Sequence, residues 1–378
     1  MSAARHTAGR PVGTPVPEPF NGAAHGLRGV AALGVFVAHM LGGVGENVYA
    51  DHPTFLLSVA PFWHLGTFGV FLFFTISGFV IWPSVRRYSP GAFAWRRFVR
   101  LYPLFLFFSL LFLALNLVVE REPELNDPWT VLAALTFTNL LTGTDQLTPN
   151  AWSLSYEVAF YALTGAGAWF AFTLRSRAGL LLFGAVAVLF VWMWPKALFF
   201  VGGLLVRWGH ERVSRVPLMR RRVFEALLLV AMVLLAAGAK RSFHQADFLD
   251  PSNWLTVAVT TAWFAFAVAP GSLVGLVLDN RVAAYLGTTS YSLYLAHPYT
   301  YFAVRELWVR LGLFTHDTVA SMTLFCAATV LVTLPFTHAV WLVLERWPYR
   351  LCFKRGVYAR PAGEAPPASV PLGAGAVR

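Results

Sequence analysis

Long apolar runs separated by short polar or basic loops dominate this sequence of 378 residues. Most of the runs are long enough for an α-helix to cross the hydrocarbon core of a bilayer, which is roughly 30 Å thick. The runs lie at residues 27–44, 65–83, 101–119, 129–145, 151–174, 178–194, 196–208, 223–239, 253–270, 283–304 and 318–344. This pattern predicts an all-α polytopic membrane protein.

The basic residues indicate how many of these runs cross the membrane, because Lys and Arg gather on the cytoplasmic side of membrane helices. If every run crossed, the basic stretches 175–177, 207–222 and 346–355 would all face outward. Treating the weakly apolar run 129–145 as a short re-entrant or interfacial segment returns all three stretches to the cytoplasm. The sequence therefore predicts about ten transmembrane helices with both termini cytoplasmic, of which run 196–208 is short for a crossing.

The ends of the chain differ from the apolar middle. Residues 1–24 and 356–378 are polar and rich in Pro and Gly, which is typical of disordered segments. We therefore expect a single membrane domain at residues 25–355, with a disordered cytoplasmic tail on each side.

Composition supports this picture and excludes other classes. The chain is 57% hydrophobic and 12% charged, which is too apolar for a soluble domain of this length. The formal net charge of +11 does not indicate a nucleic-acid partner, because the Arg residues stand in short loops beside apolar runs. The 2 Cys and 10 His residues form no disulfide or metal-binding motif, so we expect no metal site.

Arg28 and His39 are ionisable residues within the otherwise apolar first run. Their spacing closes about three helical turns, so both side chains share one helix face, roughly 16 Å apart. Ionisable groups at membrane depth are costly and by default indicate function. The predicted topology puts Arg28 near the cytoplasmic end and His39 toward the outer half. The structural alternatives are a snorkelling Arg and a core His.

Three further arginines, Arg96, Arg97 and Arg100, stand at the cytoplasmic start of the third span. They could simply anchor that span. Three guanidinium groups this close together also suit a polyphosphate, since Arg offers fixed bidentate donors. Coenzyme A is a cytosolic molecule with that charge pattern.

Two other segments carry polar side chains into apolar runs. In AWSLSYEVAFY, Glu157 lies well inside its run, and Trp152, Ser153 and Tyr161 beside it predict a cavity lining. A purely structural carboxylate is the alternative there. In SYSLYLAHP, helical spacing brings together Ser290, Tyr291, Tyr294 and His297. Interfacial belt residues are the alternative for these tyrosines.

A small-residue step, Ser77 and Gly78, lies in the inner half of the second predicted span. Such steps let helices approach closely, so we expect it to serve packing rather than catalysis.

Five segments of the chain together resemble the bacterial acyltransferase family three membrane proteins. They are LRGVAALGVFVAH, GVFLFFTISGFVI, RRFVRLYPL, WSLSYEVAFY and YLGTTSYSLYLAHP, in the order that the family has them, and they lie within residues 26 to about 350. The resemblance implies a ten-helix enzyme of the bacterial cytoplasmic membrane. Such enzymes move an acyl group, commonly acetyl, from cytosolic acyl-CoA to a hydroxyl of a surface glycan, a lipid-linked sugar or a small glycosylated metabolite, without a permanently bound cofactor.

The resemblance also implies roles for single residues. It makes Arg28 and His39 essential, maps the arginine pair before span three onto Arg96 and Arg97, and maps the acidic residue of the tryptophan motif onto Glu157. The chain departs from the family at two positions, where His25 and Phe71 replace an Asp that many members carry.

These expectations combine into a hypothetical mechanism. The phosphates of CoA bind Arg28, Arg96, Arg97 and Arg100 at the cytoplasmic mouth. His39 lies at the thioester and acts as a general base on the acceptor hydroxyl, or alternatively forms an acyl-His intermediate. Glu157, placed toward the outer half, orients His39 or binds sugar hydroxyls. The expected substrate-binding residues are Trp152, Ser153, Tyr161, Ser290, Tyr291, Tyr294 and His297.

A solute or proton-coupled transporter is the alternative from another class, because intramembrane Arg, His and Glu also serve transport paths. Transporters commonly show internal repeats, and none is visible here. The expected partners are acyl-CoA, a glycan or lipid-linked sugar acceptor and membrane lipid. The sequence leaves open which acceptor is used, the acyl chain length and the oligomeric state.

Overall fold

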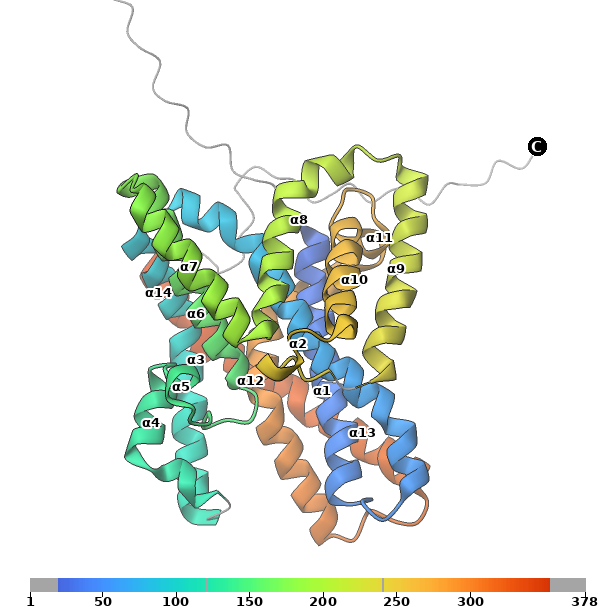
Figure 1. The fold of residues 1–378 in the computed structure, drawn as a ribbon. Helices are drawn as coiled ribbons and strands as arrows, with labels where there is room; N and C mark the ends of the chain where they lie inside the picture. The colour runs from blue at the N-terminus through green and yellow to red at the C-terminus, as the bar shows by residue number, and fades with distance from the viewer. Residues whose placement is uncertain (1–19, 120–121, 240, 354–378) are drawn as a thin grey trace, which may run out of the picture.

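The computed structural model describes residues 20–119, 122–239 and 241–353, and helices make up most of these ranges, with no strand among them (Figure 1). The predicted all-α class is confirmed. The longer helices are α1 (Gly22–Asn47), α2 (Pro53–Arg87), α3 (Pro90–Val119), α9 (Leu218–Gly238), α12 (Arg281–Arg310) and α13 (Thr318–Val340). Four helices have 17 residues each: α6 (Trp152–Ala168), α7 (Arg177–Met193), α8 (Leu198–Ser214) and α10 (Pro251–Ala267). The short helices are α4 (Pro128–Leu135), α5 (Asn139–Thr142), α11 (Leu273–Leu278) and α14 (Trp347–Phe353).

Several single turns join these helices. The 3-10 turns are η1 (Pro123–Asn126), η3 (Pro195–Ala197) and η4 (Gln245–Asp247). Two π-helical segments, η2 (Trp169–Thr173) and η5 (Trp341–Arg346), extend α6 and α13. π-Helical turns are rare and are frequently found at functional sites.

Four helical stretches are long and apolar enough to cross a membrane: α1, α2, α3 and the continuous stretch Thr318–Phe353. The pair α7 and α8, bent by 116° at a short break, adds a fifth if it is counted as one span. Of the other helices, α4, α5 and α11 are far too short to cross, α6 and α10 are close to the minimum length, and α9 and α12 carry more charged or polar side chains. The coarser prediction of a multi-helix membrane protein holds, whereas the number of ten spans and the cytoplasmic termini stay predictions.

The segment 129–145 behaves as its weak apolar character predicted. It forms α4 and α5, of 8 and 4 residues, which are too short to cross a bilayer. The side chain of Asp127 starts α4 by accepting a hydrogen bond from the backbone N–H of Thr130.

The start of α1 corrects a predicted boundary. The side chain of Asn21 accepts a hydrogen bond of 2.9 Å from the backbone N–H of Ala24, which caps the helix. The helix therefore begins at Gly22, so residues 22–24 are helical and the boundary predicted at residue 25 is wrong. Residues 1–19 and 354–378, which contain the rest of the predicted tails, lie outside the described ranges.

Several connections of the bundle gather at its two ends (Figure 1). The connections α2–α3, α6–α7, α8–α9 and α10–α11 lie near the top of the view, and the connections α1–α2 and α12–α13 lie at the bottom. The arginine-rich stretches 86–100, 175–177 and 207–222 all belong to the upper group. One end of the bundle is therefore basic, which agrees with the predicted orientation.

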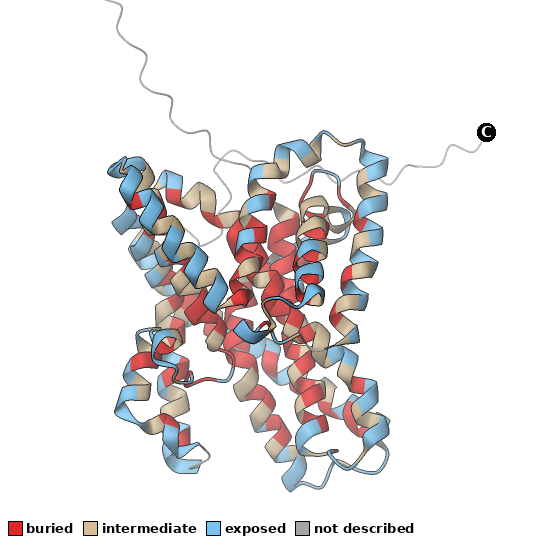
Figure 2. Cartoon of the chain, in the orientation of Figure 1, coloured by how far each residue is buried: buried red, intermediate tan, exposed pale blue. Residues whose placement is uncertain are grey.

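Helix α1 lies in the buried centre of the bundle, between α2 and α12 (Figure 2). Glycines allow this close approach. A Cβ atom at Gly66 would lie 1.9 Å from the Cβ of Ala38, and one at Gly287 would lie 2.2 Å from the carbonyl oxygen of His25. The predicted small-residue step also serves packing, because a Cβ at Gly78 would lie 2.1 Å from the carbonyl oxygen of Phe200 in α8.

Phe71, one of the two departures from the family pattern, belongs to the core. It is 1% exposed and stacks on Phe199 of α8 at 4.7 Å between ring centroids, with the edge of Phe243 at 4.9 Å. An aromatic cluster therefore occupies the position where many members carry an Asp, and its contribution is packing.

We predict that Gly66→Ala lowers the free energy of unfolding by about 1–3 kcal/mol, because the new methyl group overpacks the contact between α1 and α2. Gly184→Ala in α7 is the control, since nothing lies within 4 Å of a Cβ there. Alanine is the better helix former, so the control should unfold at or above the wild-type temperature. Thermal unfolding in detergent measures both, and equal temperatures for the two variants would contradict the packing role.

Candidate active site

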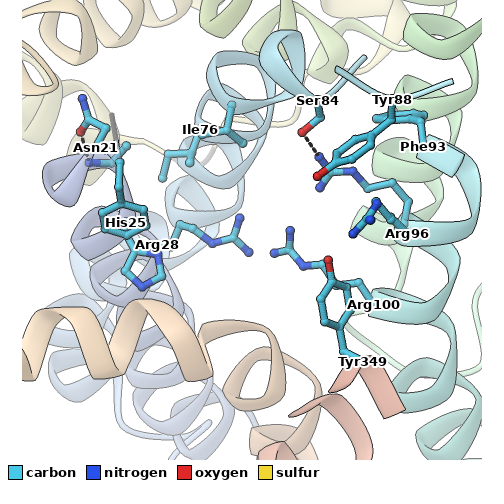
Figure 3. Close-up of a pocket in the computed structure, with 14 residues that line it drawn as sticks. Asn21, His25, Arg28, Ile76, Ser84, Tyr88, Phe93, Arg96, Arg100 and Tyr349 are labelled. Carbon is cyan, nitrogen blue, oxygen red and sulfur yellow. Dashed lines mark hydrogen bonds between the residues drawn. The ribbon is translucent and has the colours of Figure 1, made fainter. Parts of the chain in front are cut away.

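A cavity of about 300 Å³ brings together residues from α1, α2, α3 and α14 (Figure 3). Its lining includes all four arginines that the sequence analysis predicts to hold phosphates: Arg28, Arg96, Arg97 and Arg100. The side chains of Arg28 and Arg100 extend toward each other across it. Residues far apart in the sequence therefore form one strongly basic cavity, called the arginine cavity below.

Neighbouring side chains fix the arginines in place. An Nη atom of Arg97 donates a hydrogen bond of 3.1 Å to the hydroxyl of Ser84. The guanidinium group of Arg96 lies 4.3 Å from the ring centroids of both Tyr88 and Phe353. Preorganised guanidinium groups of this kind suit a ligand with several phosphate groups.

His25, the second departure from the family pattern, lines the same cavity. Its Nε2 atom lies 3.0 Å from the carbonyl oxygen of Ala284 and 3.1 Å from the hydroxyl of Thr288, both in α12. Where many members carry an acid, this chain thus has an imidazole that joins α1 to α12.

Glu345 is a buried acid that the sequence analysis missed. It lies in η5, is 0% exposed and accepts a hydrogen bond of 2.8 Å from the hydroxyl of Ser292. The positive charges of Arg100 and Arg28 act on its carboxylate. It was missed because it stands just beyond the last apolar run, among basic residues, where it reads as part of a cytoplasmic loop.

His39 pairs with His297 of α12. The Nδ1 atom of His39 lies 2.9 Å from the carbonyl oxygen of Val35 and 3.3 Å from Nε2 of His297. The edge of Trp63 packs against the His39 ring, with 5.6 Å between centroids. His297 was predicted as a substrate ligand, and its position against His39 was not foreseen because nothing in the sequence pairs these two helices.

Glu157 makes different contacts from those expected. It accepts hydrogen bonds from Ser77, at 3.0 Å, and from the hydroxyl of Tyr161. Because Ser77 and Glu157 touch, they cannot lie in opposite halves of the membrane, as the sequence analysis assumed. No hydrogen bond joins Glu157 to His39 among the described residues, so the expectation that it orients His39 directly is wrong. The Tyr161 ring instead lies 4.8 Å from the guanidinium of Arg97.

The other predicted substrate residues contact groups within the fold, most of them through hydrogen bonds, and none of them lines the arginine cavity. Ser290 bonds its own helix, at the carbonyl of Gly287. The hydroxyl of Tyr291 donates to the carbonyl of Leu101 in α3 at 2.7 Å. Trp152 lies 5.4 Å from the ammonium group of Lys196.

Tyr294 and Ser153 belong to a contact between α12 and the start of α6. The Tyr294 hydroxyl lies 2.8 Å from the Ser153 hydroxyl and 2.8 Å from the carbonyl oxygen of Asn150. Pro298 has no N–H to donate to the carbonyl of Tyr294, and the side-chain amide of Asn150 donates to that oxygen instead. The sequence shows that Pro298 follows Tyr294 by one helical turn and leaves its carbonyl free. It does not show that Asn150 is the group that bonds this carbonyl.

No group of three or more His, Cys, Asp or Glu side chains able to hold a metal ion occurs in the described part of the chain.

Comparison with known proteins identifies a family and one curated relative. A family model described as an acyltransferase domain, acyltransferase family 3, matches residues 21–338. The chain is similar to a curated protein named Acyltransferase MdmB, from Streptomyces mycarofaciens, with 34% identity over 151 residues. That match covers 36% of this chain and 36% of the relative, so it spans about a third of the relative's length. No solved structure matches.

We predict that Tyr291→Phe lowers the free energy of unfolding by about 1–3 kcal/mol, because it leaves the buried Leu101 carbonyl without this partner. Tyr285→Phe on the same helix is the control. Its hydroxyl bonds His338, but the residue is 42% exposed, so water replaces the lost bond. If thermal unfolding shows no difference between the two variants, Tyr291 does not join α12 to α3, and the predicted substrate role is favoured again.

Proposed function

Since the chain belongs to acyltransferase family 3 and is an acyl-transferring enzyme of membranes, we propose that it takes an acyl group, commonly acetyl, from cytosolic acyl-CoA and passes it to a sugar hydroxyl. The proposed acceptor is an exported or surface polysaccharide or its lipid-linked precursor, and the proposed location is the bacterial cytoplasmic membrane. Family membership favours the enzyme over the transporter, which was the alternative class in the sequence analysis.

The arginine cavity is the observation that supports acyl-CoA as the acyl donor. Arg28 comes from α1, whereas Arg96, Arg97 and Arg100 come from the start of α3, yet all four line one cavity. Coenzyme A carries a diphosphate and a 3′-phosphate, which need several positive charges at fixed positions. A role as membrane anchors alone would not require four arginines to converge, and two of them, Arg28 and Arg100, are only 7% exposed.

Two carboxylates support this donor site. Glu345 is a buried carboxyl group on which the charges of Arg100 and Arg28 act. Glu157, expected from the sequence to be catalytic, accepts a hydrogen bond from Tyr161, whose ring lies under Arg97. We therefore propose that Glu157 acts as a positioning residue for the arginines, a role that differs from the one expected.

The acyl transfer itself is proposed to occur at His39. The spacing of Arg28 and His39 on one helix, roughly 16 Å, allows the pantetheine arm to reach from the arginine cavity to the imidazole. His39 takes the proton of the acceptor hydroxyl, and the resulting oxygen nucleophile attacks the thioester carbonyl. When the C–S bond breaks, the proton passes from His39 to the sulfur of CoA. An acyl-His39 intermediate is the alternative route.

The depth of His39 in the membrane supports the proposed acceptor. His39 lies three turns further from the basic end of α1 than Arg28, toward the connection between α1 and α2. Under the proposed orientation this is the outer half of the membrane, where an exported or lipid-linked glycan is accessible. A small glycosylated metabolite in the cytosol is the alternative acceptor.

We predict that His39→Ala lowers the acceptor-dependent release of CoA from acetyl-CoA by about 10²–10⁴-fold, the usual contribution of a general base. The assay uses purified protein in proteoliposomes and a panel of soluble and lipid-linked sugars. His64→Ala is the matched control, because His64 is also a histidine of the membrane bundle and only bonds the Ala237 carbonyl. Near wild-type activity of His39→Ala would refute the assignment.

We predict that Arg96→Gln and Arg97→Gln each raise the KM for acetyl-CoA by about 10–100-fold, as expected for the loss of a hydrogen bond to a charged group. The KM for the acceptor should not change. Arg86→Gln, at an exposed arginine in the last turn of α2, is the control and should leave both constants unchanged. Equal changes in both KM values would indicate a folding role instead.

A further inference from the structure

The hydrogen bonds of His39 and His297 fix the proton positions on both rings. The Nδ1 atom of His297 lies 3.0 Å from the carbonyl oxygen of Leu293, and that of His39 lies 2.9 Å from the carbonyl oxygen of Val35. A carbonyl oxygen only accepts, so each Nδ1 carries a proton and, in the neutral ring, each Nε2 carries a lone pair. In each helix, the carbonyl one turn before the histidine thus sets the tautomer of the ring.

The contact between the rings is consistent with this arrangement. Nε2 of His297, which has the lone pair, lies 3.3 Å from Nδ1 of His39, which has the proton. The Nδ1 proton of His39 is therefore shared between the Val35 carbonyl and His297. The Nε2 lone pair of His39 is left for chemistry.

We infer that His297 is a positioning residue for His39: it accepts the Nδ1 proton of His39, orients the ring and stabilises the charge that His39 gains during acyl transfer. This inference rests on the proposed function, in which His39 is the base. It replaces the substrate-binding role that the sequence predicted for His297.

The step is balanced as follows. The proton of the acceptor hydroxyl moves to Nε2 of His39, so His39 becomes an imidazolium while its Nδ1–H points at Nε2 of His297. The new C–O bond forms, the C–S bond of the thioester breaks, and the same proton leaves Nε2 for the sulfur. His297 keeps its own proton throughout and supplies an acceptor to a transient cation.

A neutral partner fits these surroundings. His297 is 0% exposed, and the edge of Phe36 lies 5.9 Å from it between centroids. No carboxylate hydrogen-bonds either ring among the described residues. In a low-dielectric interior an imidazole can serve as the acceptor without the cost of a second buried charge.

The position of the lone pair gives a discriminating test. Gln has an amide oxygen at about the reach of Nε2, whereas the shorter Asn places its amide near Nδ1, and Leu offers no acceptor. We expect His297→Leu and His297→Asn to lower kcat by about 10–100-fold with the KM for acetyl-CoA unchanged. His297→Gln should recover most of this loss. All variants are compared by thermal unfolding in detergent to exclude misfolding.

A second measurement does not depend on activity. Solid-state ¹⁵N NMR of the histidine-labelled full chain, with signals assigned by their absence in His39→Ala and His297→Leu, should show protonated Nδ1 and unprotonated Nε2 on both rings. An Nε2-protonated His39, or equal kcat for the Gln and Asn variants, would overturn the inference. If His39→Ala keeps its activity, the proposed function fails, whereas an inactive His39→Ala together with a fully active His297→Leu refutes only the role of His297.

Discussion

The close contact of α1 with α2 and α12 is the constraint on which the rest of the site depends. α1 carries His25, Arg28 and His39, and its neighbours approach it through positions that tolerate no side chain. A Cβ at Gly29 would lie 2.6 Å from Leu286, and one at Gly42 would lie 2.0 Å from the Trp63 ring, which packs on His39. Because α1 packs this closely against both neighbours, a shift of α1 would move the proposed donor site and the histidine pair together.

Tyrosines of α12 extend this constraint to the arginine-bearing helix. Tyr291 and Tyr299 donate hydrogen bonds of 2.7 Å each to the carbonyls of Leu101 and Phe108 in α3. Tyr291, which was expected to contact substrate, and Tyr299 thus hold α3 against the helix that carries His297. A buried hydroxyl in an apolar bundle needs a partner, and here the partners are backbone oxygens of another helix.

The sequence predicts those parts of the site that follow from helix periodicity and charge bias. The shared face of Arg28 and His39 depends on local geometry, and the gathering of Arg28 with Arg96 and Arg97 depends on which helix ends lie on the same side of the membrane. Both can be derived without knowing which helices touch. The helical class and the short helices within 129–145 follow from the same signals.

Lateral pairing of helices could not be derived in this way. The contact between His39 and His297, the bond between Ser77 and Glu157, and the burial of Glu345 all depend on which helices become neighbours. Glu345 shows the limit most clearly, because its burial depends on the packing of η5 against α3 and α12 and not on its neighbours in the sequence.

The unequal lengths of the helices have a consequence for the surrounding lipid. α1, α2 and α3 contain 26, 35 and 30 residues, whereas α7, α8 and α10 contain 17 each, and the α7–α8 and α9–α10 connections reach only mid-height in Figure 1. A straight helix of 17 residues measures roughly 26 Å, less than the hydrocarbon core of about 30 Å. The flank that carries α7, α8 and α10 therefore offers a shorter hydrophobic length than α1, α2 and α3, and a bilayer matches a flank of this kind by thinning locally. Such mismatch makes the packing of this flank, and of α8 against α2, sensitive to the chain length of the host lipid.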